Sequence, residues 1–221
     1  MFSYTKCQAL GCTQSAITPF YENSETAPKG CFCLQHTQNQ ELVKQSIYQY
    51  LRTHDKIIGL VANGMTFQDV DFSNKNFYGC SFQHCTFSNI KTVNCRSRLT
   101  LFDFSVFTDC SFLESSLQFT SFAGAAFSHV LFTGSDLVQN NFMGITAYQS
   151  SFDDSDLYNS RFVRAKLINT SLRNCNIKKA LFYELETQDV SFKMSNTREA
   201  LFDKSGSAIM QNENATDTWL M

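Results

Sequence analysis

A large apolar residue recurs at nearly every fifth position of this 221-residue chain, from Phe67 to Phe202. Of the 28 positions in this column, 23 are Phe, Leu or Ile. An α-helix repeats its apolar face every 3.6 residues and a strand repeats it every second residue, so neither element fits a period of five. Self-similarity at a fixed period over such a length indicates a solenoid, whose stacked coils bury a continuous core.

A second column, two residues before the first, is restricted to small side chains such as Ser105. The restriction in size indicates that these side chains also point inward. Asp or Asn often stands between the two columns, as in the stretch Ser135-Asp136-Leu137. In these features residues 64–204 resemble the pentapeptide-repeat family, whose motif is a small residue, Asp or Asn, then Leu or Phe, and two variable residues.

The resemblance implies an all-β solenoid, a right-handed quadrilateral β-helix with four pentapeptides per coil and about seven coils of 20 residues each. Neighbouring coils should pair through their backbones at an interstrand spacing of ~4.8 Å. The large inward residues on each side should stack into a ladder that fills the interior, so we expect a packed core and no ligand channel. One such core ladder consists of Phe82, Phe102, Phe122, Phe142, Phe162 and Phe182.

Breaks in the two columns test this interpretation. Where Thr92 replaces a large residue, Ile90 fills the small column, and such a swap conserves core volume. Ser97 has no such compensation, and we expect looser packing around it. Lys75 and Asn140 occupy small-column positions, and the sequence suggests no partner for either side chain.

The nine cysteines divide into two groups. Five lie in the small inward column, where Cys acts as a compact buried hydrophobe. The other four lie near the N-terminus and form, with a histidine, two short ligand pairs separated by a loop. This arrangement is typical of tetrahedral zinc bound by thiolates and imidazole, and it resembles a small zinc knuckle. The predicted ligands are Cys7, Cys12, Cys33 and His36, with Cys31 as the alternative.

We therefore assign residues 1–37 to a zinc-binding module in which the metal is structural. So short a segment cannot bury enough surface to fold alone, and metal binding should supply much of its folding free energy. Four protein ligands would leave no open coordination position for catalysis.

The rest of the chain divides into three predicted segments. Apolar residues fall on one side of a helix within residues 38–63, which we assign to an α-helical cap. A cap is needed because a β-helix exposes unpaired strand edges at both ends. Residues 64–204 form the β-helix. Residues 205–221 are a C-terminal cap or tail, and we also consider a homodimer formed through a solenoid end.

The sequence contains no nucleophile elbow, phosphate loop or dinucleotide-binding motif, and we expect a non-enzymatic protein. The N-terminus lacks the basic start and apolar stretch of a signal peptide. No window approaches the ~20 apolar residues that cross a membrane. We expect a cytoplasmic protein that does not contact a membrane, and the net charge of −2 does not predict nucleic-acid binding.

Some members of the pentapeptide-repeat family, the quinolone-resistance proteins, resemble duplex DNA in shape and charge and bind DNA gyrase. Such mimicry should need a strong negative field. Residues 64–204, however, contain 14 acids and 13 bases. At a spacing of 20 residues several of these charges should also pair, among them Arg164 with Glu184 and Lys179 with Glu199. A DNA mimic that binds gyrase is kept as the alternative function.

Four apolar residues, Leu99, Phe104, Leu113 and Phe119, occupy nominally outward positions near the irregular repeat at Ser97. A contiguous exposed patch of this kind often marks a partner surface. Alternatively, the coil bulges there and these residues refill the gap. We adopt the first interpretation, which makes the protein an interaction adaptor or scaffold for a protein partner of unknown identity. A third interpretation makes the zinc module a nucleic-acid contact.

Overall fold

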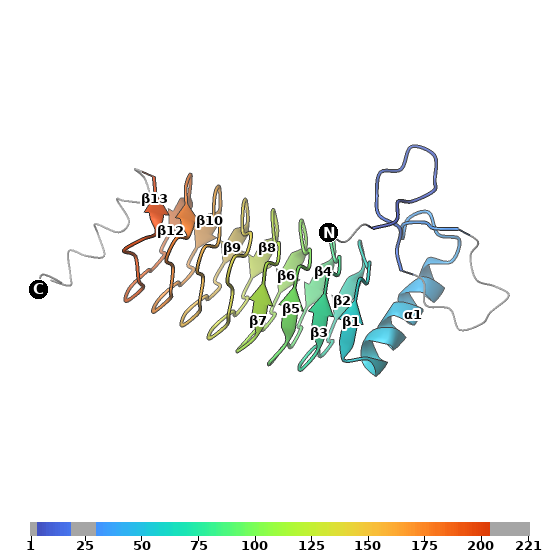
Figure 1. The fold of residues 1–221 in the computed structure, drawn as a ribbon, viewed down its shortest axis with the longest axis horizontal. Coiled ribbons are helices and arrows are strands. Elements are labelled where there is room, and N and C mark those ends of the chain that lie inside the picture. Colours follow the sequence, from blue (N-terminus) through green and yellow to red (C-terminus); the bar gives the residue numbers. More distant parts are fainter. Residues whose placement is uncertain (1–3, 19–29, 204–221) are drawn as a thin grey trace, which may run out of the picture.

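The computed structural model describes residues 4–18 and 30–203. One helix, α1 (Gln40–Thr53), stands at the N-terminal end of a rod built from short strands (Figure 1). The predicted C-terminal cap or tail, residues 205–221, lies outside the described residues. Within the described ranges, no helix combines the length and the apolar character that spanning a bilayer requires.

The strands of the rod are two or three residues long. They are β1 (Lys56–Ile58), β2 (Thr66–Gln68), β3 (Asn76–Tyr78), β4 (Thr86–Ser88), β5 (Arg96–Arg98), β6 (Val106–Thr108), β7 (Ser116–Gln118), β8 (Ala126–Ser128), β9 (Thr146–Tyr148), β10 (Lys166–Ile168), β11 (Leu181–Phe182), β12 (Glu186–Gln188) and β13 (Leu201–Phe202).

These strands pair in parallel with a register of 20 residues, as Phe77, Ser97 and Leu117 do. They form a four-stranded sheet (β1-β3-β5-β7), a seven-stranded sheet (β12-β10-β9-β8-β6-β4-β2) and a two-stranded sheet (β11-β13). The seven-stranded sheet takes one strand from each of seven successive coils. The prediction of an all-β solenoid with about seven coils of 20 residues is confirmed.

Each coil has four sides, which we number in chain order by the large inward residue at the centre of each. Face 1 holds the four-stranded sheet and Phe77, and face 2 holds Phe102. Face 3 holds the seven-stranded sheet and Phe107, and face 4 holds Phe112. Residues ten apart in the chain therefore lie on opposite faces, whereas residues 20 apart lie on the same face of neighbouring coils.

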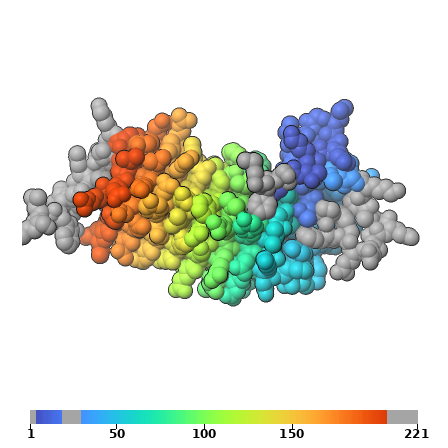
Figure 2. Space-filling view, viewed as in Figure 1, coloured from blue at the N-terminus to red at the C-terminus, as the bar shows by residue number. Residues whose placement is uncertain are grey.

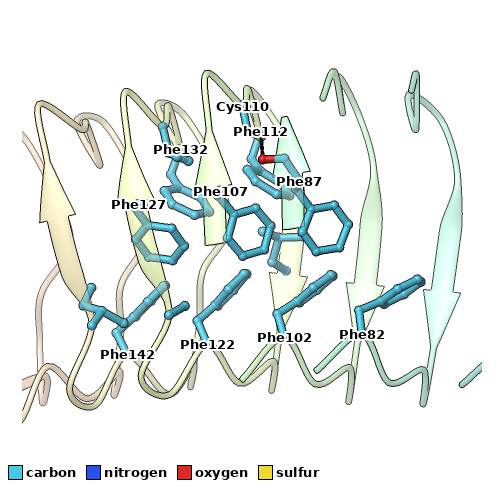
Figure 3. Close-up of a cluster of buried hydrophobic side chains, with 14 of the residues drawn as sticks. Phe82, Phe87, Phe102, Phe107, Cys110, Phe112, Phe122, Phe127, Phe132 and Phe142 are labelled. Atoms are coloured by element: carbon cyan, nitrogen blue, oxygen red, sulfur yellow. Dashed lines mark hydrogen bonds between the residues drawn. The ribbon is translucent and has the colours of Figure 1, made fainter. Parts of the chain in front are cut away.

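Ladders of aromatic rings fill the core, as Figure 3 shows. On face 2, successive buried rings stack 4.8 to 5.4 Å apart with planes within 19° of parallel. Rings of adjacent faces meet edge to face, as Phe102 and Phe107 do at 5.8 Å and 67°. Both arrangements suit the charge distribution of an aromatic ring. The face 2 ladder consists of Phe82, Phe102, Phe122, Phe142, Phe162 and Phe182.

Hydrogen bonding, as well as size, explains the small inward column. The hydroxyl of Ser105 donates to the carbonyl of Phe82 (2.8 Å) and accepts from the backbone N–H of Cys85 (2.9 Å). The Cys85 thiol donates in the same way to the carbonyl of Ala62 (3.1 Å). Each such side chain ties its coil to the preceding one and leaves no buried polar atom of its own unpaired.

The sequence suggested no hydrogen-bond partner for the side chains of Asn140 and Lys75, but both have one in the structure. The Asn140 amide follows the hydroxyl pattern: its oxygen accepts from the N–H of Thr120 (2.8 Å) and its nitrogen donates to the carbonyl of Leu117 (2.6 Å). The Lys75 ammonium donates to the carbonyl of His54 (3.0 Å), directly after α1. A cation is favourable at a helix C-terminus, so Lys75 fastens α1 to the rod.

Helix α1 covers the N-terminal end of the core. The Asn39 side chain caps its start by accepting from the N–H of Leu42 (3.0 Å). Val43, Ile47 and Leu51 are buried in the same apolar core as the first ring of the solenoid. The helix thereby removes from water the end of the ladder that an uncapped coil would expose.

The solenoid begins earlier than the predicted boundary at residue 64. The helix ends at Thr53, and β1 already pairs with β3. The reason is that Ile57 and Ala62 are buried members of the five-residue column that the sequence argument counted only from Phe67. Residues 55–63 therefore belong to the first coil and not to the cap.

The expected loose packing around Ser97 is present. Among the described residues, its hydroxyl oxygen is the single buried side-chain oxygen or nitrogen without a hydrogen-bond partner. A cavity of about 10 Å³ adjoins it, lined in part by Phe77 and Leu117, its neighbours in the face 1 ladder. Ser97 occupies a position of the face 1 ladder at which the neighbouring coils have Phe77 and Leu117. The cavity is present because the serine side chain is smaller than these residues.

Candidate metal centre and rod surface

The first two predicted metal ligands lie on an antiparallel hairpin. Lys6 bridges Ser15, and the N–H of Cys7 donates to the carbonyl of Gln14 (2.9 Å). The turn of this hairpin is closed by a bond from the N–H of Cys12 to the carbonyl of residue 9 (3.0 Å). The four residues between the two cysteines therefore form the turn, and both thiols face the same side.

The second ligand pair lies on a tight turn. The N–H of His36 donates to the carbonyl of Cys33 (3.0 Å), which brings the imidazole beside the thiol three residues earlier in the chain. Cys31, the alternative ligand, is exposed and stays outside the cluster. Its backbone is held by Gln8, which donates to its carbonyl (2.9 Å) and accepts from its N–H (3.2 Å).

The four ligand atoms of Cys7, Cys12, Cys33 and His36 all lie within 4.8 Å of one another. The His36 Nδ1 is 3.5 Å from the Cys7 sulfur and 3.2 Å from the Cys33 sulfur, and the Cys12 and Cys33 sulfurs are 3.9 Å apart. A zinc tetrahedron has edges of roughly 3.8 Å between sulfurs and roughly 3.6 Å between sulfur and nitrogen. The cluster has the size and the donor set for such an ion.

The thiols of the cluster differ in acidity. Burial raises the pKa of Cys7, but hydrogen bonds from the backbone of Cys33 and of residue 9, and from the side chains of His36 and Cys12, outweigh it and lower the pKa to about 6. Burial raises the pKa of Cys33. A thiolate is therefore available near neutral pH to begin metal binding.

The Cys/His module, which we define as residues 4–18 and 30–37, docks on face 2 of the first coil. Figure 2 shows it in blue, standing out from the line of the rod. Thr18 donates its N–H to the carbonyl of Val61 (2.9 Å), and its hydroxyl accepts from the N–H of Val61 (2.8 Å). Ile17 and Leu34 join the core beside α1, and the Tyr4 hydroxyl donates to the carbonyl of residue 79 (3.1 Å). The module thus pairs the strand edge that the first coil would otherwise expose.

The structure brings three of the four predicted partner-binding residues together. Leu99 and Phe119 lie in neighbouring coils at the edge between faces 1 and 2, and Phe104 lies at the edge between faces 2 and 3. Their exposed fractions are 40%, 38% and 58%. Leu101 lies on face 2 between these edges. Leu113 is not part of this group, because it follows Phe112 on the opposite side of the rod.

We call Leu99, Leu101, Phe104 and Phe119 the face 2 strip. Its aromatic members have neighbours on the surface: the Phe104 ring stacks on His84 at 5.2 Å, and the Arg98 guanidinium lies 5.2 Å from the centre of the Phe119 ring. The next coil offers room for Phe104 because residue 124 is glycine, whose missing Cβ would stand 2.7 Å from the ring.

Backbone conformation at the edges of the rod makes these residues unusual. Each coil turns through left-handed residues, and Leu99, Phe104 and Phe119 have φ values of 56°, 57° and 53°. Polar residues or glycine stand at nearly all the other left-handed edges of the described rod, with Met194 as a further apolar exception. A left-handed conformation costs a bulky side chain about 1–2 kcal/mol, so an exposed Leu or Phe here adds nothing to stability.

Charges on the rod pair between coils. Arg164 contacts Glu184 at 2.7 Å, and Arg173 contacts Asp153 at 3.3 Å. Pairing of this kind neutralises the acids that take part in it, whereas imitation of a phosphate backbone needs a dense array of unpaired negative charges. The gyrase-binding alternative is therefore not favoured.

The prediction of an ion pair between Lys179 and Glu199 is wrong. Glu199 pairs with Lys178 at 3.2 Å, and not with Lys179. The Lys179 ammonium instead lies 5.5 Å from the centre of the Tyr158 ring in the preceding coil. The Lys179 side chain points from its edge position toward the preceding coil and away from Glu199. A separation of 20 residues is therefore not sufficient to predict which charged side chains form an ion pair.

Comparison with known proteins identifies the repeat. Residues 125–202 match the family model for the pentapeptide repeat region. These residues contain the pentapeptide repeat. A comparison with curated proteins gives no match. The Cys/His module lies outside the matched residues, and its ligand set therefore comes from the structure.

Solved structures similar to this chain include HetL from the cyanobacterium Nostoc, a pentapeptide repeat protein involved in heterocyst differentiation regulation. HetL is 12% identical, with a TM-score of 0.43 over 73% of this chain and 97% of that chain. The pentapeptide repeat protein Rfr23 from the cyanobacterium Cyanothece matches at 11% identity and 0.40, over 72% and 99%. The plasmid-mediated fluoroquinolone resistance protein QnrB1 matches at 13% and 0.42, over 72% and 99%.

Proposed function

We propose that this protein is a non-enzymatic adaptor that binds a protein partner through the face 2 strip. The observation that carries the proposal is the presence of Leu99, Phe104 and Phe119 at exposed left-handed edges, where the fold elsewhere uses polar residues or glycine. Exposed aromatic and aliphatic residues grouped on one surface are typical of the anchors in a protein interface.

A stiff rod suits this role. Every coil is tied to its neighbours by backbone bonds and by the inward hydroxyl and thiol bonds, and the stacked core leaves little room for movement. A surface that is ordered before binding loses little conformational entropy when the partner docks.

We infer that the Cys/His module holds one structural zinc ion. The distances among Cys7, Cys12, Cys33 and His36 support this, as does the complete set of four protein donors. The inferred role of the ion is to fold the module, so that Thr18, Ile17 and Leu34 can pair with the first coil.

Affinity capture tests the adaptor function. The zinc-loaded full-length protein, a Leu99→Asp/Phe119→Asp variant and a Leu113→Asp/Leu131→Asp variant are each used as bait in lysate of the source cell, and bound proteins are identified by mass spectrometry. The third bait is a matched control because Leu113 and Leu131 are apolar surface residues of face 4.

We expect one partner to be retained by the first and third baits and lost by the second, with unchanged circular dichroism for all three. Retention by the Leu99→Asp/Phe119→Asp variant would contradict the proposal. Unfolding of that variant would show that the two side chains serve the core, and would contradict it equally.

A further inference from the structure

A cleft of about 580 Å³ lies between the Cys/His module and the first two coils of the rod. This volume is within the range of sites that bind small molecules or peptide segments. One wall is the hairpin strand 13–15, the second is the turn 33–35, and the floor is the edge between faces 2 and 3 at residues 63, 64, 83 and 84. The cleft exists because the module docks beside this edge instead of covering it.

Four of the ten residues that line the cleft carry uncharged amides. Gln14 and Gln35 contribute exposed side-chain amides from the module, and Asn63 and Gln83 contribute half-buried ones from the rod. Within the described part of the chain, the amides of Gln14 and Gln35 make no hydrogen bond to another residue. Each amide can donate and accept, which is the pattern that a peptide backbone presents.

The rod amides are held in place by their neighbours. The Asn63 oxygen accepts from the backbone N–H of Gln83 (2.9 Å) and from the Ser81 hydroxyl (2.8 Å). The Gln83 nitrogen donates to the Asp103 carboxylate (3.1 Å). A polar group fixed before binding contributes more to affinity than one that must first be ordered.

One end of the cleft adjoins an exposed aromatic pair. His84 lines the cleft, and its ring stacks on Phe104 at 5.2 Å with an angle of 10° between the planes. Phe104 also belongs to the face 2 strip, so the cleft and the strip form a continuous surface. An apolar side chain that left the cleft at this end would meet the two rings directly.

We propose that the cleft binds an extended peptide segment of the partner, with the peptide backbone on the amides and an apolar side chain on the His84–Phe104 pair. This proposal rests on the proposed adaptor function and adds the chemistry of the partner to it.

Electrostatics favour a peptide over a nucleic acid. No lysine or arginine lines the cleft. Three thiolates around a divalent zinc ion would give the adjoining centre a charge of about −1, and Asp103 stands at the aromatic end. A phosphate backbone requires cations to replace its counterions, and the residues that line the cleft supply no lysine or arginine. A neutral or basic peptide meets no such penalty.

Peptide selection tests the proposal. A phage-displayed library of random dodecapeptides is selected on the zinc-loaded full-length protein. Enriched peptides are then synthesised with a fluorescein label and titrated by fluorescence polarisation. The variants are Gln35→Ala in the cleft, Phe104→Ala at its end and Leu131→Ala on face 4 as the matched control. We expect enriched peptides to share an apolar residue and to lose at least 10-fold in affinity with the first two variants and less than 2-fold with the control.

Three results would overturn the proposal: no enrichment over a surface without protein, equal affinity for all three variants, or tight binding of a labelled oligothymidylate that weakens steeply with salt. The last would assign the cleft to nucleic acid. Failure here can be told from failure of the adaptor function, because partner capture by the face 2 strip is measured with Leu99→Asp/Phe119→Asp, which leaves the lining of the cleft unchanged.

Discussion

Replacing Ser97 with valine should stabilise the protein. Its hydroxyl is buried and has no partner among the described residues, and a buried polar group left unpaired costs about 1–3 kcal/mol. The adjoining cavity of about 10 Å³ is apolar and close to the smallest that holds one water, but that water would need at least two polar partners and would find one. The cavity is therefore free for a methyl group.

Valine replaces the hydroxyl with a methyl group and adds one more. Removing the unpaired oxygen contributes about 1–2 kcal/mol, and burying one additional methyl group adds about 0.8 kcal/mol. We expect the free energy of unfolding to rise by about 2–3 kcal/mol. Ser97→Phe should instead destabilise by about 1–3 kcal/mol, because the cavity is too small for a ring and overpacking forces strained rotamers.

Ser105 supplies the matched control, since it is equally buried but makes two hydrogen bonds. Ser105→Val should destabilise by about 2–4 kcal/mol, because it leaves one carbonyl and one N–H unpaired. Urea denaturation followed by circular dichroism, with unchanged m-values, measures all three variants. A Ser97→Val protein no more stable than the wild type would refute the reasoning, as would equal effects at the two serines.

Three further predictions follow from other sites. Asn140→Leu should lower the free energy of unfolding by about 2–4 kcal/mol in the same assay, since it removes two buried hydrogen bonds; a change below about 1 kcal/mol would contradict the assigned bonds. His36→Ala should abolish binding of one zinc ion per chain, measured by elemental analysis after dialysis, whereas Cys31→Ser should retain it; loss from both would mean that Cys31 is a ligand. Burial raises the pKa of Cys85 and Cys95 to about 12 from an ordinary value of 9.0, so the folded state holds protons that the unfolded state releases. Stability should therefore fall as the pH rises above 9, and thermal melts of a Cys85→Ser/Cys95→Ser variant should show a shallower fall; an identical fall would assign the effect to other groups.

The sequence was sufficient to predict the solenoid because a period of five restricts each inward residue to one role. Core membership of the face 2 ladder, the 20-residue register and the void at Ser97 all follow from counting in steps of five. The same counting could have found the true start of the rod, since Ile57 and Ala62 continue the column. Ile57 and Ala62 are smaller than the phenylalanines of the column and directly follow the helical pattern, so the sequence analysis assigned them to the helical cap.

Three-dimensional placement of outward residues was harder to predict. Leu113 was grouped with Phe104, although their separation of nine positions in the sequence places them on opposite sides of the coil. Leu99 and Phe119 project because they lie at left-handed edges of the coil. The sequence does not mark these edges, because many different polar residues occupy the corresponding positions in other coils. The cleft depends on the docking of Thr18 onto Val61, a contact between segments whose sequences show no common pattern.

The structure brings together four of the five N-terminal donor residues, and these are the four ligands that the sequence analysis preferred over Cys31. Spacing alone left Cys31 and Cys33 as competitors, because either could pair with His36 in the sequence. The structure separates them: the backbone of Cys31 is held by Gln8, and the following turn directs Cys33 toward the other thiols. The contact between Gln8, which is not a ligand, and the backbone of Cys31 decides which cysteine joins the cluster. No sequence motif predicts that contact.

The measurement that tests the central claim most directly is hydroxyl-radical footprinting of the zinc-loaded protein, alone and in complex with its captured partner, read residue by residue by mass spectrometry. The account predicts protection of Leu99, Phe104 and Phe119 in the complex, with Leu113 and Leu131 modified as in the free protein. Protection of Leu113 and Leu131 with the face 2 strip unchanged would place the partner on the opposite side of the rod and contradict the account.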